Sequence, residues 1–261
     1  PKFDWPRIDN PKINYPVTED NLSKTIEAEK RAIEQIENVL ETRKNKIACI
    51  IIEPIQGEGG DNYFRKEFFQ KLREICDKEE ILLIFDEVQT GMGMTGRMWA
   101  FQHYDVIPDV ISFGKKTQVC GILANKEKLD QIPNNVFKES SRINSTFGGN
   151  YIDMLRFKLI LEVIEKENLV HNAEEKGKYI IDRLNDIAKH TNKVHSVRGL
   201  GLFIAFDFDS DINRSAFINT CFDNKMIILP CGEKSVRLRP HLNLSFKEVN
   251  KALEIIKLAL K

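Results

Sequence analysis

The sequence lacks an excess of charge of either sign, because 39 basic side chains (Lys and Arg) offset 39 acidic ones (Asp and Glu). Nucleic acids and anionic membranes attract proteins through concentrated basic surfaces, so we expect neither as a partner. The sequence also lacks the run of ~18 apolar residues that a membrane span requires. Its first segment, Pro1 to Pro16, is too polar for a secretory signal. Glycine and proline are few, 14 and 9 among 261 residues, which excludes collagen-like and low-complexity chains.

Cysteine is scarce, and the 5 cysteines are widely spaced, without a Cys-x-x-Cys pair that would indicate a zinc or redox site. An odd number of scattered cysteines fits a reducing compartment, so we expect a cytoplasmic protein. The 5 histidines show neither metal-ligand spacing nor a catalytic-triad context. We therefore expect no metal site.

What is present is an alternation of helical and strand patterns. A proline-rich start, residues 1–17, predicts an extended segment that lies on another part of the chain. A charged helix is predicted over residues 20–46, and an amphipathic helix over 64–77. Between and after them stand three short apolar runs, IACIIIEP, ILLIFDE and VISFG. Such runs are typical of parallel strands buried on both faces, which predicts an α/β domain whose chemistry lies at the carboxyl ends of the strands.

The second half of the chain predicts a smaller α+β unit. Long helices are expected near residues 151–167 and 173–190, and strands at VHSVRGLGLFIAFDF, MIILP and SVRLRP, with a helix between the first two. Ser245 with Glu248 forms a capping box that begins a last helix. We place the boundary between the two units at residue 165, so that the units are 1–165 and 166–261.

Two glycine motifs resemble nucleotide-binding loops, but their contexts differ. GMGMTG, residues 91–96, matches G-x-G-x-x-G, yet DEVQT separates it from the strand and no clear helix start follows. FGKKT fails as a phosphate-binding P-loop because Asp109 occupies the position of the first glycine. An ordinary glycine loop is the better interpretation of GMGMTG.

The stronger signal is a carboxylate and an amine at the ends of two buried strands. Asp86 ends ILLIFD and Lys115 ends VISFGK, so both can point into one crevice of a parallel sheet. One interpretation is a buried ion pair. The other is a pyridoxal phosphate site, in which a lysine binds the aldehyde and an aspartate keeps the pyridine nitrogen protonated.

Four motifs in order resemble the class III, fold-type I aminotransferases: EPIQGEGG at 53–60, IFDEVQTGMGMTGR at 84–97, FGKK at 113–116 and STFGGN at 145–150. FGKKTQVCG and the opening PKFDWPRIDNP are similar to the lysine ε-aminotransferase branch. The resemblance implies a fold-type I architecture, with a mostly parallel sheet in a three-layer large domain plus a smaller α+β carboxy-terminal domain. It also implies pyridoxal 5'-phosphate as cofactor.

The resemblance also implies roles for individual residues. Lys115 matches the lysine bound to the cofactor, with Lys116 as its neighbour, and Asp86 matches the partner of the pyridine nitrogen. Val88 matches the side chain on the ring face, and Gln89 the partner of the phenolic oxygen. Thr146 matches the threonine that reaches the cofactor phosphate of a neighbouring subunit, which implies a homodimer with shared active sites. Glu87 has a weaker claim and supports the site.

Substrate specificity is implied by a movable glutamate. In the resembling family the Glu of QGEGG pairs with the Arg of VRLRP and leaves it when a dicarboxylate arrives, which corresponds to Glu58 and Arg237. An arginine left unpaired and buried in the other half-reaction would cost several kcal/mol. Arg239 is a nearby alternative, and Glu53 is expected to orient the site.

The implied activity is transfer of the ε-amine of L-lysine to 2-oxoglutarate, giving 2-aminoadipate 6-semialdehyde and L-glutamate. Two alternatives stay open: another ω-amine donor (ornithine, acetylornithine or 4-aminobutyrate), or a non-catalytic fragment. The family's amino-terminal phosphate loop, outer-face aromatic and carboxylate-binding arginine have no counterpart here, and the chain begins at Pro1. We therefore expect about three-fifths of a two-domain subunit.

Overall fold

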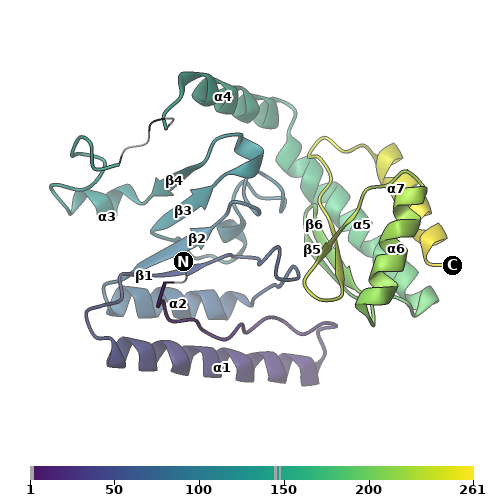
Figure 1. Cartoon of the computed structure of the whole chain (residues 1–261), viewed down its shortest axis with the longest axis horizontal. Helices are drawn as coiled ribbons and strands as arrows, with labels where there is room; N and C mark the ends of the chain where they lie inside the picture. Colours follow the sequence, from purple (N-terminus) through teal and green to yellow (C-terminus); the bar gives the residue numbers. More distant parts are fainter. Residues whose placement is uncertain (1–2, 144–145, 147) are drawn as a thin grey trace.

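The computed structural model describes residues 3–143, 146 and 148–261. It contains two separate four-stranded sheets, each with its own helices (Figure 1). In the described part of the chain no helix is long and apolar enough to cross a membrane.

The first sheet consists of β1 (Cys49–Ile52), β2 (Leu82–Asp86), β3 (Val110–Phe113) and β4 (Gly121–Ala124), in that spatial order. The pairs β1–β2 and β2–β3 are parallel and β3–β4 is antiparallel. The three predicted parallel strands are thus confirmed. The sequence analysis missed β4, as well as α3 (Lys126–Asp130), because both are short and carry no clear periodicity.

One face of this sheet is covered by α2 (Lys66–Lys78) and α1 (Glu19–Thr42), which lie together at the bottom of Figure 1. The Phe69 ring of α2 is fully buried, 5.1 Å from the Phe85 ring and 4.4 Å from the Tyr104 ring. Burying a side chain of this size stabilises the fold by about 2–3 kcal/mol. The helix α1 begins at Glu19, just after the extended segment predicted over residues 1–17, and Thr18 is its N-cap. Its buried side chains recur at helical spacing.

The opposite face of the first sheet is open, which corrects the expectation that its strands are buried on both sides. Side chains alternate along a strand, and Ile51 and Leu82, on this face, are 58% and 42% exposed. Ile122 of β4, opposite Ser112, continues the face and is 46% exposed. Both α1 and α2 pack on the other side, and no described segment covers these side chains. The helix layer therefore buries Leu83 and Phe85, whose side chains point toward it, whereas Leu82 on the other face stays exposed.

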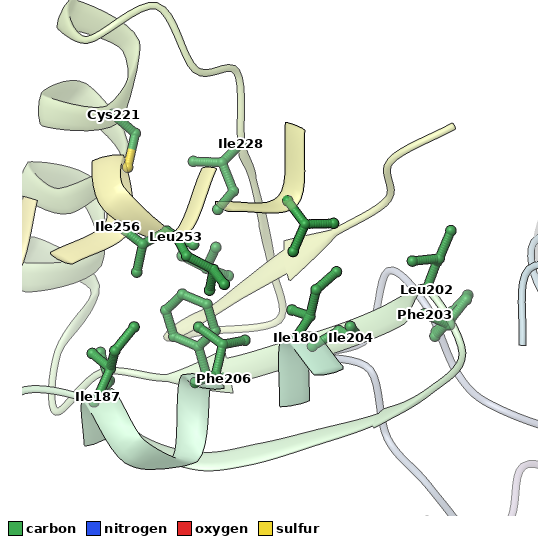
Figure 2. Packing of buried hydrophobic residues seen from close by; sticks show 14 of the residues in the cluster. Ile180, Ile187, Leu202, Phe203, Ile204, Phe206, Cys221, Ile228, Leu253 and Ile256 are labelled. Atoms are coloured by element: carbon green, nitrogen blue, oxygen red, sulfur yellow. The ribbon is translucent and has the colours of Figure 1, made fainter. Parts of the chain in front are cut away.

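The second sheet has the order β5–β6–β8–β7 and is antiparallel throughout. Its strands are β5 (His195–Leu200), β6 (Phe203–Asp207), β7 (Leu229–Cys231) and β8 (Ser235–Leu238). Against it pack α5 (Leu169–Thr191), α6 (Asp211–Asp223) and α7 (Phe246–Ala259). The side chains between them, among them Ile180, Phe206 and Leu253, form its core (Figure 2).

The single strand expected over residues 194–208 is instead a hairpin of β5 and β6. The turn lies at Gly201, whose φ of 53° is left-handed. A Cβ at this glycine would stand 2.4 Å from the Thr95 carbonyl carbon, so only glycine fits. The apolar run on both sides of the turn hid it from the sequence analysis. The capping box of Ser245 and Glu248 at the start of α7 is confirmed.

The helix α4 (Tyr151–Lys166) lies between the two sheets in sequence, and it is drawn above the first sheet at the top of Figure 1. The predicted boundary at residue 165 falls in the last turn of this helix. The extended start of the chain lies on the body as expected: the Ile13 N–H donates to the Tyr63 carbonyl at 2.8 Å, and Arg43 of the α1 C-cap donates to the Asp4 carbonyl at 2.9 Å. Short 3-10 helices occupy Ala100–His103 and Lys115–Thr117.

Asp109, just before β3, ties together three elements of the first unit. Its buried carboxylate accepts hydrogen bonds from the Leu83 N–H at 2.8 Å and from the Arg73 guanidinium at 2.9 Å, and Lys128 of α3 lies 2.7 Å away. Burial by itself would raise the pKa of Asp109, but the bonds from Lys128, Leu83 and Arg73 outweigh it and lower the pKa. The residue that excludes a P-loop is thus a structural anchor.

We predict that Asp109→Asn lowers the free energy of unfolding by about 2–4 kcal/mol at neutral pH, because the buried carboxylate loses its charge-assisted bonds to the largely buried Arg73 and to Lys128. Urea unfolding measures this difference. Asp105→Asn, which removes an exposed ion pair with Lys66, should cost less than about 1 kcal/mol. Since the folded pKa is lowered, the Asp109 contribution is present above the unfolded pKa of ~3.9 and is lost as the pH falls below it. Equal losses in the two variants would contradict the assignment.

Candidate functional site

The predicted site residues follow three parallel strands at the same edge of the first sheet. Parallel pairing of β1, β2 and β3 brings their carboxyl ends together. The loop after β1 carries Glu53 and Glu58, the segment after β2 carries Val88 and Gln89, and Lys115 comes after β3. The expected edge of the sheet is therefore where the chemistry-bearing side chains gather.

Asp86, the last residue of β2, faces the open side of the sheet, opposite Ser112 of β3. Its carboxylate Oδ1 accepts a hydrogen bond from the Val88 N–H at 3.0 Å, which fixes its orientation. The Val88 methyl groups stand 3.6 Å from where a Cβ on Gly114 would lie, so Val88 packs against the backbone just before Lys115.

Lys115 has a left-handed backbone, with φ of 54°, and an exposed side chain. Its neighbour Lys116, which is less exposed, donates from Nζ to the Gln89 carbonyl at 2.5 Å. Burial, together with the positive charges of Arg239 and Lys115, lowers the pKa of Lys116 to about 8. The two adjacent lysines are therefore distinct: one amine is free in the cavity and the other is held by backbone.

The charges of both Asp86 and Lys115 act on the carboxyl group of Glu53. Burial raises the pKa of Glu53, and the negative charge of Asp86 raises it further. The Gly57 N–H opposes this rise, because it donates a hydrogen bond to Glu53 Oε2 at 3.0 Å. The Lys115 ammonium opposes the rise as well. Since these charges act on one carboxyl group, Asp86 and Lys115 both lie within electrostatic reach of Glu53.

Glu58 and Arg237 form an ion pair, with Arg237 Nη1 2.7 Å from Glu58 Oε2. The partners are unequal, because the Glu58 side chain is 78% exposed and the Arg237 side chain 14%. Arg237 Nε is buried and has no hydrogen-bond partner among the described residues. Arg237 belongs to β8 of the second sheet, so the pair spans the two units. A Cβ at Gly57 would stand 2.4 Å from the Gln89 amide oxygen, so this loop packs directly on Gln89.

A cavity of about 830 Å³ brings several of these side chains together. Glu58, Gln89, Lys115 and Arg237 line it, with Lys116, Arg239 and apolar side chains of α4. Asp86, Val88 and Glu53 are not among the lining residues. Thr146 is exposed and does not line the cavity either, and its motif neighbours Ser145 and Phe147 lie outside the described residues. The structure thus joins four predicted residues in one cavity and places three at the strand ends beside it.

The motif GMGMTG is a buried loop between the two units. A Cβ at Gly96 would stand 3.0 Å from the Glu174 Cβ of α5, and the Met94 carbonyl accepts a hydrogen bond from the Leu202 N–H. Only a short 3-10 helix follows, so the loop does not open a helix as a dinucleotide site requires. Glu87 is buried and accepts hydrogen bonds from the Ala100 and Phe101 N–H groups and from Thr90. It holds this loop and makes no contact with the cavity.

Arg239 has a different role from Arg237. It donates to the Asp61 carboxylate at 2.5 Å, and its guanidinium lies 3.2 Å from the centre of the Phe203 ring. The sequence analysis missed Asp61 and its other neighbour, Arg198 in RGLG, because a lone charge in an apolar strand was the only available signal. Among the described residues, no group of three or more His, Cys, Asp or Glu side chains could hold a metal ion.

A family model for class III aminotransferases matches residues 4–260. The chain belongs to this family. The L-lysine-epsilon aminotransferase of Mycobacterium tuberculosis is 47% identical over the whole chain, and that of Streptomyces clavuligerus is 42% identical over 98% of it. The chain spans 57% and 56% of the length of these relatives.

A solved class III structure confirms the fold. Lysine aminotransferase from M. tuberculosis in the internal aldimine form superposes with a TM-score of 0.94 and 46% sequence identity, over 99% of this chain and 59% of that one. The chain therefore has the fold-type I architecture that the motifs imply. Three of the four motifs, EPIQGEGG, IFDEVQTGMGMTGR and FGKK, lie at the three strand ends, and the first of them carries Glu58.

The contrast between the two lysines predicts a pH dependence of stability. The folded pKa of Lys116, about 8, lies below its unfolded value of ~10.4, so the unfolded chain binds more protons between these values. The stability of the parent chain relative to Lys116→Met should therefore rise, by about 2 kcal/mol between about pH 8 and about pH 10. Urea unfolding at several pH values measures it. Lys44→Met, which removes an exposed lysine, corrects for the loss of one charge, and a falling difference would contradict the prediction.

Proposed function

We propose that this chain is part of a pyridoxal-phosphate-dependent L-lysine 6-aminotransferase. The reaction transfers the ε-amine of L-lysine to 2-oxoglutarate and yields 2-aminoadipate 6-semialdehyde and L-glutamate. The observation that carries the proposal is the Glu58–Arg237 ion pair at the cavity that Lys115 also lines. The identity of 47% to an L-lysine-epsilon aminotransferase supports the same substrate class.

The residues present fit pyridoxal phosphate on three structural grounds. The Asp86 carboxylate is fixed by the Val88 N–H at a strand end, the Lys115 side chain is exposed at the next strand end, and the cavity of about 830 Å³ has room for a cofactor and a substrate. Bound there, the cofactor would supply an aldehyde that condenses with amines and a ring that accepts an electron pair. The Lys115 amine would hold it, and the Asp86 carboxylate would keep its pyridine nitrogen protonated.

The other predicted residues would orient the cofactor. Val88 would pack on the ring face, and Gln89 would donate from its amide to the phenolic oxygen. Thr146 would bind the phosphate held by a second copy of the chain, so we propose a homodimer with shared sites. Freed from the aldehyde, Lys115 would move a proton from the ε-carbon of the substrate. Glu53, whose pKa burial raises, would help to hold the charges of Asp86 and Lys115 in place.

Glu58 and Arg237 would select between the two substrates. L-lysine reacts through its ε-amine, so no carboxylate lies beside the reacting carbon, and Glu58 then neutralises Arg237. The 1-carboxylate of 2-oxoglutarate does lie beside it, and would displace Glu58 from Arg237. The exposed Glu58 side chain can leave into solvent, whereas Arg237 stays buried. A buried arginine without either partner would cost several kcal/mol, so the exchange keeps it paired in both halves of the reaction.

We predict that adding pyridoxal phosphate to the parent chain produces a visible-range absorbance, and that Lys115→Ala abolishes this absorbance and all turnover. Lys116→Ala is the matched control and should retain the absorbance, because its amine is held by the Gln89 carbonyl. Absorbance spectra and an amine-transfer assay measure the two results. If Lys116→Ala lost the absorbance and turnover while Lys115→Ala retained both, the proposal would have named the wrong lysine. A parent chain without the absorbance would contradict the prediction and favour the alternative of a non-catalytic fragment.

The amine donor is tested by comparing L-lysine with L-ornithine, N-acetylornithine and 4-aminobutyrate, each with 2-oxoglutarate. We predict that L-lysine has the highest kcat/KM, by at least about tenfold, because a chain shorter by one methylene changes transition-state binding by about 1–3 kcal/mol. Glutamate formation gives one readout for all donors. A preference for L-ornithine or 4-aminobutyrate would replace L-lysine by another ω-amine, while leaving the class III chemistry in place.

A further inference from the structure

The loop that carries Glu58 is held by an arginine outside the cavity. Residues 56–62 leave the first sheet and form a small bridge between Gln56 and Asn62. At the tip of this loop, Arg198 of β5 donates from Nη2 to the Gly60 carbonyl at 2.6 Å and from Nε to the Asp61 carbonyl at 2.9 Å. Two adjacent backbone carbonyls are thus bound by one planar guanidinium, which restricts both their position and their direction.

Arg198 is itself fixed on the second sheet. Its side chain is buried, Nη1 donates to the Ser196 carbonyl at 2.8 Å, and Nη2 lies 2.9 Å from the Asp207 carboxylate. The Ser235 hydroxyl bonds both the Arg198 guanidinium, at 3.1 Å, and Asp207. A buried guanidinium whose three nitrogens are all hydrogen-bonded in this way is rigid. The loop therefore takes its position from β5, β6 and β8.

The backbone of Glu58 is held from the other side as well. The Gly232 N–H, in the turn between β7 and β8, donates to the Glu58 carbonyl at 2.9 Å. Gly232 has a left-handed φ of 53°, and a Cβ there would stand 2.8 Å from the Gly60 Cα, so the turn and the loop touch. By contrast, the exposed Glu58 side chain has Arg237 as its partner among the described residues. The main chain is restrained while the carboxylate is free to rotate.

We propose that Arg198 is a positioning residue for the exchange of Glu58 on Arg237. By holding the Gly60 and Asp61 carbonyls, it keeps the Glu58 backbone at a fixed place on the second sheet, so that substrate exchange needs only a rotation of the side chain. This inference rests on the proposed function, since it concerns the same ion pair. Unlike Arg239, Arg198 does not line the cavity, so it acts only through the loop.

The test is a double-mutant cycle on the binding of glutarate, a dicarboxylate that cannot react. Arg198→Lys keeps the positive charge but loses the planar guanidinium that binds both carbonyls in fixed directions. A looser loop weakens the Glu58–Arg237 pair, so glutarate meets less competition and should bind about threefold more tightly. In a Glu58→Gln background the same substitution should change binding by less than about 1.5-fold. Calorimetry on the full chain measures both. Arg183→Lys, an exposed arginine beside Tyr179, should change nothing.

A second readout separates the two ways of failing. Hydrogen exchange of the Gly232 amide, which is bonded to the Glu58 carbonyl, should be at least about tenfold faster in Arg198→Lys. If Arg198→Lys does not fold, as judged by circular dichroism, Ser235→Ala loosens the same guanidinium and should shift both readouts in the same directions.

Unchanged exchange, or equal shifts of glutarate affinity in both backgrounds, would overturn the role of Arg198. If glutarate does not bind, or if Glu58→Gln leaves its affinity unchanged, the Glu58–Arg237 part of the proposed function fails, and this inference fails with it.

Discussion

The two sheets of this protein meet through the loop of residues 56–62. Arg198 donates hydrogen bonds to the Gly60 and Asp61 carbonyls, and Arg239 pairs with the Asp61 carboxylate. Burying Asp61 and Arg198 removes both charges from water, which is costly unless every partner is in place. Burial raises the pKa of Asp61, and the Arg239 and Arg198 charges oppose this shift. A buried polar network of this kind adds little to net stability. Its main effect is to hold the parts that it joins in one relative position.

That single position matters because the site is divided between the units. Asp86 and Lys115, which we propose to face the cofactor, lie at strand ends of the first sheet, while Arg237 belongs to β8 of the second. A displacement of about 1 Å between the sheets would move Arg237 relative to Asp86 and Lys115, and a misplacement of this size between groups that act together can cost about 100-fold in rate. The proposed exchange of Glu58 on Arg237 therefore requires a rigid joint and one movable side chain, and the loop at 56–62 provides both.

The sequence was informative where a pattern repeats or where a motif is shared. The three parallel strands, the long helices and the capping box at Ser245 follow from periodicity and cap chemistry, and the position of Lys115 at a strand end follows from the FGKK motif. It was less informative where tertiary contact decides. The hairpin at Gly201 depends on the proximity of Thr95, more than a hundred positions earlier in the chain. The open face at Ile51 depends on which helices are present, and no local pattern reports that. Arg198 shows no pattern at all, because its partners come from four separate segments.

The left-handed backbone of Lys115 has a thermodynamic consequence. For a residue with a Cβ this conformation costs about 1–2 kcal/mol relative to a right-handed one, and glycine would adopt it without that cost. A glycine would therefore suit the folded backbone better, yet it would remove the one amine that is exposed at this strand end. The chain is less stable at this residue than its fold would permit, and the lost free energy is stored in the main chain that carries the amine we propose to react.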